Sequence, residues 1–331
     1  MGSDSNSGIN FGVVVIGRNE GDRLRVCLES AVGLAEQTVY VDSGSTDGSV
    51  GMACNLGVEV VQLDMSIPFT AARSRNEGFQ CLLELLPNVS YVQFVDGDCE
   101  IQQNWSDVAL GFLQHHEDVA VVCGRRRERF PDQTVYNLLC DIEWDTPVGE
   151  TKACGGDAMM SVQAFAEVRG FRDDLIAGEE PELCVRLRQN GWKIWRLDEE
   201  MTLHDAAMNR FSQWWKRSVR AGYAFAEGAA IHGAPPERHW VKEARRARLW
   251  SVIIPFLILA GTVLDNYALL ALLIYPLQVL RGCMKSAQKS RRVAGLYAFF
   301  IMLGKFPEFA GQLKYFWGRL SNKRSPLIEY K

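Results

Sequence analysis

Short apolar runs alternate with longer amphipathic stretches in the first part of the chain. The runs cover Phe11–Ile16, Thr38–Val41, Val58–Leu63 and Val92–Val95, and none alternates regularly between apolar and polar positions. Such runs are typical of strands buried on both faces of a sheet. The stretches at about 22–34 and 70–86 have helical spacing, and a shorter helix precedes Val58. This alternation predicts an α/β fold, a doubly wound and mostly parallel sheet flanked by helices, with ligands at the carboxyl ends of its strands.

The C-terminal pattern is different. Two apolar runs, Val252–Leu264 and Tyr267–Leu280, are separated by Asp265-Asn266 and flanked by basic residues. At about 1.5 Å per residue, each run would extend roughly 20 Å, less than the roughly 30 Å of a bilayer core. The pair at about 252–280 is therefore interpreted as a membrane hairpin, re-entrant or just spanning, and residues 293–320 as interfacial helices. A single span and a buried helical pair used in oligomerisation are the alternatives.

Residues 210–223 carry aromatic and basic side chains at helical spacing. The pattern fits an amphipathic packing helix, and it also fits an interfacial helix near a membrane and the phosphates of a ligand.

Charge and cysteine usage limit the environment of the protein. The net charge is −4, but acids dominate the body and Lys and Arg dominate the tail from about residue 240. Because the basic residues flank apolar runs, the tail suggests an anionic membrane surface and argues against nucleic acid as a partner. The nine cysteines include no Cys-x-x-Cys pair, which favours reduced thiols in the cytosol. Residues 1–10 are polar and are expected to be a disordered or non-native extension.

Acidic residues follow three of the predicted strands. Glu20, Asp42 and Asp96 stand at these strand ends, and Asp98 follows Asp96 across a single glycine. Since the carboxyl ends of parallel strands share one edge, these acids should lie along one rim. The Asp96-Gly97-Asp98 pair could hold a hard divalent cation, or it could be a turn that caps the next helix.

Later segments add candidate chemistry. Two glycines before Asp157 would admit a ligand close to the backbone. The basic run 125–129 is interpreted mainly as a solvated strand end, with contact to an anionic acceptor as the alternative. Gly178–Glu182 opens a predicted helix, where acids are also favoured by the helix dipole. A strand starting near residue 191 is followed by His204, which is expected in a loop.

Of two common nucleotide-binding classes, the sequence fits the first poorly and excludes the second. The first turn reads Gly-Arg-Asn-Glu-Gly, so it lacks the G-x-G-x-x-G pattern of dinucleotide-binding oxidoreductases, and no P-loop motif occurs in the chain.

Taken in order, these motifs resemble the inverting family-2 glycosyltransferases with a GT-A fold. The similarity covers about residues 13–230 and rests on six segments: Val15–Gly21, Val41–Asp47, Ala72–Gly78, Asp96–Asp98, Gly178–Glu180 and Leu203–Asp205. The resemblance implies a nucleotide-sugar donor, UDP- or GDP-linked, and a divalent cation, Mg²⁺ or Mn²⁺.

The resemblance also implies roles for individual residues. Asp98 would bind the metal directly, with Asp96 nearer the ribose or a metal-bound water, and Glu180 would be the base, with Glu179 and Glu182 left open. His204 is implied as a ligand of the metal or the diphosphate. The remaining implied contacts are Asn19, Glu20, Asp42, Ser43, Arg75, Asn76, Gly156 and Asp157 for the donor, Arg217 and Arg220 for the diphosphate, and Glu179 and Trp144 for the acceptor.

The sequence thus predicts a metal-dependent inverting glycosyltransferase. Its catalytic domain is expected at 11–239, and its membrane-associated helical region at 240–331, on the cytoplasmic face of the cell membrane. The expected acceptor is a lipid-linked molecule or a glycan, in polysaccharide or glycolipid assembly. The alternatives are a sugar nucleotidyltransferase and a catalytically silent module that binds nucleotide sugar. The sequence does not identify the sugar, the nucleotide base or the oligomeric state.

Overall fold

A computed structural model describes residues 10–285 and 290–321 of the chain. The chain divides into two compact units between Ala207 and Met208. The N-terminal extension predicted at 1–10 lies outside the described residues, apart from Asn10. The predicted domain boundary, at 239/240, would instead group residues 208–239 with the catalytic domain, and that grouping stays a prediction.

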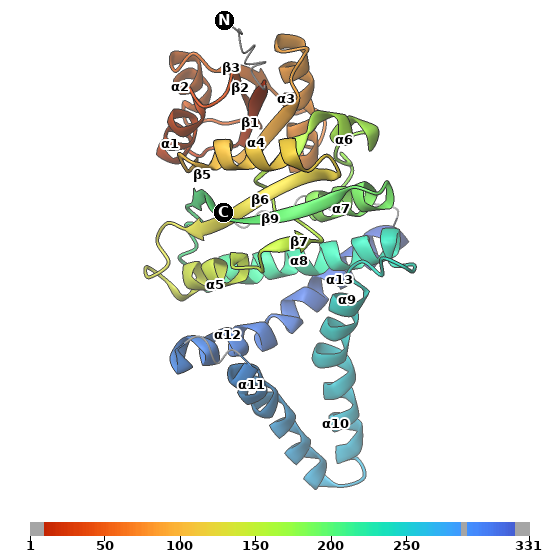
Figure 1. Cartoon of the computed structure of the whole chain (residues 1–331). Coiled ribbons are helices and arrows are strands. Elements are labelled where there is room, and N and C mark those ends of the chain that lie inside the picture. The colour runs from red at the N-terminus through yellow and green to blue at the C-terminus, as the bar shows by residue number, and fades with distance from the viewer. Residues whose placement is uncertain (1–9, 286–289, 322–331) are drawn as a thin grey trace, which may run out of the picture. The chain divides into compact units, whose positions relative to one another are not determined.

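The first unit is built on one nine-stranded sheet among the described residues. Its strand order is β3-β2-β1-β4-β8-β6-β9-β5, and β7 pairs with β9 off this path (Figure 1). The strands are β1 Phe11–Gly17, β2 Gln37–Asp42, β3 Glu59–Gln62, β4 Tyr91–Asp96, β5 Cys99–Ile101, β6 Val119–Glu128, β7 Gly149–Thr151, β8 Ala158–Ser161 and β9 Lys193–His204.

Helices of the first unit flank this sheet. Figure 1 shows α1 and α2 on one side of β1 and β2, and α3 on the other. The helices are α1 Asp22–Ala31, α2 Ser49–Asn55, α3 Ala71–Leu85, α4 Trp105–His115, α5 Val135–Trp144, α6 Val162–Glu167 and α7 Glu179–Gln189. Thr70 caps α3 by accepting a hydrogen bond from the Arg73 N–H at 3.1 Å.

The first helix differs from its predicted form at both ends. Gly21 is the N-cap, and Asp22 is the first helical residue. There the negative charge of Asp22 interacts favourably with the helix dipole. The helix ends at Ala31 because Val32 is extended, which is earlier than the predicted end near residue 34.

The sheet is parallel only in part. Strands β3, β2, β1 and β4 run parallel, as the apolar runs predict, while β8 runs antiparallel to both β4 and β6. Because β8 runs against β4, its first residue, Ala158, pairs with Phe94 close to the carboxyl end of β4. The segment that leads into β8 therefore lies beside the Asp96-Gly97-Asp98 turn.

The hydrophobic core covers both faces of the central strands. Val13, Val14 and Val15 of β1 are fully buried. Four phenylalanines from separate elements also pack edge-to-face or tilted, with ring centroids 4.7–5.4 Å apart: Phe79, Phe94, Phe165 and Phe171. Such aromatic pairs stabilise beyond their buried area, and here they fix the loop that contains Phe171.

Strand β9 is longer than the sequence indicated. It continues from Lys193 to His204, pairing in parallel with β6 and antiparallel with β5. The prediction that His204 lies in a loop is wrong, because Cys99 of β5 and Glu128 of β6 both pair with it. These pairs hold the histidine rigidly beside the Asp96-Gly97-Asp98 turn.

The second unit is helical. Its elements are α8 Phe211–His232, α9 Val241–Arg248, the π-helical turn Leu249–Ile253, α10 Ile254–Thr262, the 3₁₀ helix Asn266–Leu273, α11 Ile274–Lys285, α12 Arg291–Leu303 and α13 Lys305–Leu320. Helices α8 and α13 cross with their backbones in close approach. A Cβ at Gly222 would lie 1.9 Å from the Glu308 carbonyl oxygen, and one at Gly311 would lie 2.0 Å from that of Val219.

Two helical stretches of this unit are long and apolar enough to cross a membrane. They are Asn266–Lys285, whose apolar window has no buried residue, and Arg291–Leu320, whose window is 28% buried. The first stretch is longer than the apolar run Tyr267–Leu280, which the sequence predicted to be too short to cross a bilayer. The helix continues through the polar residues after Leu280. The second is long enough to span, whereas the sequence predicted interfacial helices there.

Candidate active site

The nucleotide end of the site is predicted at the loops that follow β1 and β2, and hydrogen bonds join these two loops. The Asn19 N–H donates to Ser45 Oγ at 2.9 Å, and the Thr46 N–H donates to the Asn19 side-chain oxygen at 2.7 Å. Asn19 adopts a positive φ of 55°, which Asn tolerates better than most residues. Glu20 pairs with Arg23 at 2.7 Å one helical turn later. Both predicted donor residues therefore lie at the rim.

Asp42 organises the second loop. Its carboxylate accepts hydrogen bonds from the N–H groups of Gly44 and Ser45, both at 2.9 Å, and from the Tyr40 hydroxyl at 2.9 Å. Burial is the main cause of a raised pKa for Tyr40, which keeps its hydroxyl protonated as the donor. Ser43 is buried, and its hydroxyl lies 3.2 Å from that of Ser74. Asp42 and Ser43 thus shape the loop, and a role in binding the base remains a prediction.

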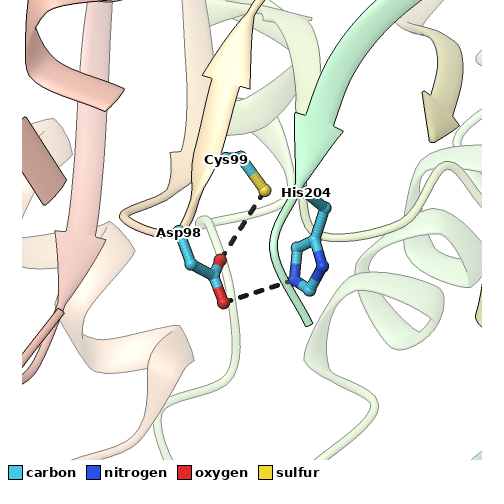
Figure 2. A group of neighbouring side chains, drawn as sticks. All are labelled: Asp98, Cys99 and His204. Atoms are coloured by element: carbon cyan, nitrogen blue, oxygen red, sulfur yellow. Dashed lines mark hydrogen bonds and ion pairs between the residues drawn. The ribbon is translucent and has the colours of Figure 1, made fainter. Parts of the chain in front are cut away.

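Asp98 and His204 meet at the centre of the rim. Figure 2 shows His204, at the end of β9, pointing toward the Asp98 carboxylate, with Nε2 3.3 Å from Oδ2. Both side chains are buried. Cys99 lies on the other side, with its thiol 3.7 Å from Asp98 Oδ1. Burial raises the pKa of Cys99 well above its ordinary value, so the thiol stays protonated. A carboxylate oxygen and an imidazole nitrogen this close can hold a divalent cation such as Mn²⁺.

Glu128 and Trp144 surround the histidine. Glu128 Oε2 lies 3.7 Å from His204 Nδ1 and accepts from the Ala206 N–H at 3.1 Å. The Trp144 ring packs edge-on against the imidazole, with centroids 4.7 Å apart. Trp144, predicted as an acceptor contact, is therefore placed on the metal side of the site.

Arg75 connects the Asp96-Gly97-Asp98 turn to helix α7. Its guanidinium donates to Asp96 Oδ1 at 2.6 Å and to Glu179 Oε1 at 2.8 Å, and it lies over the Phe171 ring. Burial alone would lower the pKa of Arg75, but Asp96 and Glu179 more than offset this, and the pKa is raised. Glu179, predicted as an acceptor contact, is therefore held in an ion pair with Arg75.

The 155–157 segment lies against the same turn. A Cβ at Gly156 would fall 2.8 Å from Arg75 Nη2 and 3.0 Å from Asp96 Oδ2, so glycine permits the close approach. Asp157 is fully buried, accepting from the Asp96 N–H at 3.0 Å and pairing with Arg126 at 2.8 Å. Asp157 lies beneath the rim and holds Asp96 and Arg126 in place, and its predicted contact with the donor stays a prediction.

Asn76 is hydrogen-bonded to the loop that follows α6. Its amide nitrogen donates to the Phe171 carbonyl at 2.8 Å and to Asp173 at 2.6 Å, and its oxygen accepts from the Phe171 N–H at 3.0 Å. The side chain therefore clamps the 171–173 loop, because all its short contacts are with that loop. The donor contact predicted for Asn76 stays a prediction.

Glu180 is held by donors that carry no charge. Its Oε1 accepts from the Cys154 N–H at 2.6 Å and lies 2.9 Å from the thiols of Cys154 and Cys184. Glu179 pairs with Arg75 and Glu182 with Arg186 at 2.8 Å. Among the three acids at this helix start, Glu180 is the one with no arginine within ion-pair distance in the described structure.

Arg217 and Arg220 lie on α8 in the second unit. Their predicted contact with the diphosphate stays a prediction.

The sequence missed Arg126. The run 125–129 was interpreted mainly as a solvated strand end, but Arg126 points inward, 15% exposed, toward Asp157 and the Trp144 ring. Its neighbours pair outward, Arg125 with Asp145 and Arg127 with Asp141. The sequence could have indicated this inward position, because successive residues of a strand such as β6 point to opposite faces.

Comparison with known proteins agrees with this fold. Residues 12–153 match the family model described as glycosyl transferase family 2. The structure is similar to the mannosyltransferase PcManGT from Pyrobaculum calidifontis in complex with GDP-Man and Mn²⁺, with a TM-score of 0.63 and 17% identity over 94% of this chain and 88% of that one. No curated protein matches the chain.

Two further solved structures are less similar. S. aureus TarS 1–349 gives a TM-score of 0.47 at 15% identity, covering 93% of this chain and 92% of that one. Glucosyl-3-phosphoglycerate synthase from Mycobacterium tuberculosis was solved in complex with Mn²⁺, UDP and glucosyl-3-phosphoglycerate. It gives a TM-score of 0.45 at 19% identity, covering 69% of this chain and 82% of that one. The fold assignment rests on the mannosyltransferase and on the family match. Residues 12–153 thus match the model of glycosyltransferase family 2, and the N-terminal unit has the GT-A fold.

Proposed function

We propose that the protein is a divalent-metal-dependent, inverting glycosyltransferase that moves a sugar from a nucleoside diphosphate to an acceptor hydroxyl. One observation carries the proposal: residues 154–157 link the carboxylate of Glu180 to the Asp96-Gly97-Asp98 turn. The Cys154 N–H donates to Glu180, Gly156 lies beside Arg75 and Asp96, and Asp157 accepts from the Asp96 N–H. Three Cα–Cα steps span at most about 11 Å, so this short segment ties the proposed base to the turn that carries the metal motif.

The metal end is suited to a departing diphosphate. Asp98 and His204 would hold the cation, and bound there it would supply positive charge that stabilises the negative charge of the leaving group. Arg126, largely buried and paired with Asp157 at 2.8 Å, lies on the same side. The similar fold of the mannosyltransferase PcManGT, which was solved with GDP-Man and Mn²⁺, supports a nucleotide sugar and a divalent cation as what this site would bind.

Glu180 supplies the base. Its two acidic neighbours in the same turn are neutralised by arginines, whereas Glu180 accepts only from an N–H and two thiols. A carboxylate in this position can take the proton of the acceptor hydroxyl while that oxygen attacks the anomeric carbon. One attack with one base inverts the anomeric configuration and requires no covalent intermediate on the protein.

The second unit supports a membrane-associated acceptor. The described stretch Asn266–Lys285 has no buried residue in its apolar window, and Leu264, Tyr267 and Leu277 are each more than 60% exposed. Water would penalise such a surface, and lipid would not. We therefore propose a lipid-linked acceptor at the cytoplasmic face of the membrane. Retention in the membrane pellet after a carbonate wash, and release by detergent, tests the location. A chain that stays soluble without detergent would contradict it.

The reaction is tested with detergent-purified protein, a panel of UDP- and GDP-sugars, Mn²⁺ or Mg²⁺, and lipid extract. We expect metal-dependent release of nucleoside diphosphate and a labelled lipid product. Glu180→Gln should abolish transfer and leave the donor Kd, measured by calorimetry, nearly unchanged; Glu182→Gln on the same helix is the control. Release of pyrophosphate would indicate a sugar nucleotidyltransferase instead. Donor binding without turnover would indicate a silent module.

A further inference from the structure

Glu180 sits in a small cluster with two cysteines. Cys184 follows it by four residues on α7, so the two side chains share one face of the helix. Cys154 comes from the loop before β8. Both sulfur atoms lie 2.9 Å from Glu180 Oε1, and they lie 3.9 Å from each other.

Both thiols are protonated and can donate a hydrogen bond. Burial raises the pKa of Cys184 to about 11, and burial also raises that of Cys154 well above its ordinary value; the Glu180 carboxylate adds to both shifts. A protonated thiol beside a carboxylate donates its hydrogen to it. Together with the Cys154 N–H, three donors converge on one oxygen of one carboxylate.

We propose that Cys154 and Cys184 are positioning residues for Glu180: their S–H groups hold Oε1 and leave Oε2 to receive the acceptor proton. This inference rests on the proposed role of Glu180 as the base. The anchoring has a physical reason. A glutamate side chain is long and has many rotamers, so it must be held before it can act as a base with a fixed geometry.

The first test does not depend on activity. In the full chain in detergent, the rate of Cys154 alkylation by iodoacetamide at pH 8 is measured by peptide mass spectrometry in wild type, Glu180→Gln and Glu182→Gln. Glu180→Gln removes the negative charge that disfavours the thiolate. We expect alkylation of the partly exposed Cys154 to accelerate about tenfold for each unit by which the thiol pKa falls. Glu182 is also buried but pairs with Arg186, so its variant controls for the loss of a buried carboxylate and, while folded, should be alkylated at the wild-type rate. Equal rates in all three proteins would overturn the contact.

The second test measures transfer. Cys184→Ala should lower kcat about tenfold with little change in the KM for donor, because the base is misplaced while the donor contacts remain. Cys184→Ser keeps a donor of similar size and should recover most of the lost kcat. Full activity in the alanine variant, or failure of serine to rescue, would overturn the positioning role. If wild type transfers no sugar, the proposed function fails, and the alkylation result still decides whether the cluster exists.

Discussion

Arg75 donates to Asp96 across 2.6 Å, and the same guanidinium donates to Glu179 across 2.8 Å. The Arg75 side chain is 3% exposed and joins three elements, α3, the end of β4 and the start of α7. One arginine thus ties the metal side of the site to the helix that carries the proposed base. Its charge is matched by two carboxylates, an arrangement that makes burial of a guanidinium tolerable.

Removing this arginine should destabilise the fold. Arg75→Met leaves Asp96 and Glu179 without their shared partner, and loss of one partner of a buried pair costs about 3–5 kcal/mol. Denaturant unfolding of the variant and wild type gives the difference in the free energy of unfolding. Arg25→Met, which breaks an exposed pair with Asp22, is the control and should cost at most about 1 kcal/mol. Equal losses in both variants would show that the Arg75 bridge has no special role.

A methyl group at position 156 should damage the site more than the fold. Gly156→Ala places a Cβ within 2.8 Å of Arg75 Nη2 and 3.0 Å of Asp96 Oδ2, so both must shift. We expect a cost of about 1–3 kcal/mol in unfolding free energy, with a fall in kcat of tenfold or more. Gly111→Ala on α4, where a Cβ meets nothing within 4 Å, should instead gain about 0.5–1 kcal/mol. Unchanged kcat in Gly156→Ala would argue against this part of the site.

Metal removal should abolish transfer reversibly. A chelator is expected to stop release of nucleoside diphosphate, and added Mn²⁺ to restore it. Asp98→Asn and His204→Ala should each weaken Mn²⁺ binding by more than about tenfold, measured by calorimetry or by the EPR signal of free Mn²⁺. Asp107→Asn on α4 is the control and should bind as wild type. If Mn²⁺ affinity survives loss of both Asp98 and His204, the cation is held elsewhere.

Helices α8 and α13 should not tolerate added volume where they cross. In Gly311→Ala the new Cβ would stand 2.0 Å from the Val219 carbonyl oxygen and 2.6 Å from the Tyr223 nitrogen, so the backbones must separate. We expect a loss of about 2 kcal/mol or more, visible as a lower Tm by circular dichroism in detergent. Gly295→Ala on α12, whose Cβ has its nearest neighbour at 4.0 Å, should instead raise the Tm by about 1–4 °C. Equal melting of the two variants would contradict the close crossing.

The sequence predicted the first strands and the acids that follow them. Buried strands such as β1 have apolar runs on both faces, and the helices between them have the matching period, so local pattern and tertiary fold agree there. Asp98 and Glu180 could be selected through the resemblance to family-2 glycosyltransferases, whose motifs stand at the starts and ends of such elements. The antiparallel course of β8 could not be predicted, since pairing with β4 depends on contacts distant in sequence.

By itself, the sequence determined the parallel half of the sheet, the position of the metal motif, and an apolar, basic C-terminal region. Only the tertiary structure decided which charged side chains meet. It placed Asp157 beneath the rim and turned Arg126 inward, and it joined Cys154 to Glu180 across 26 residues. The reason is physical: hydrophobic period is a local property of the chain, whereas the partner of a buried charge is set by which elements the fold packs together.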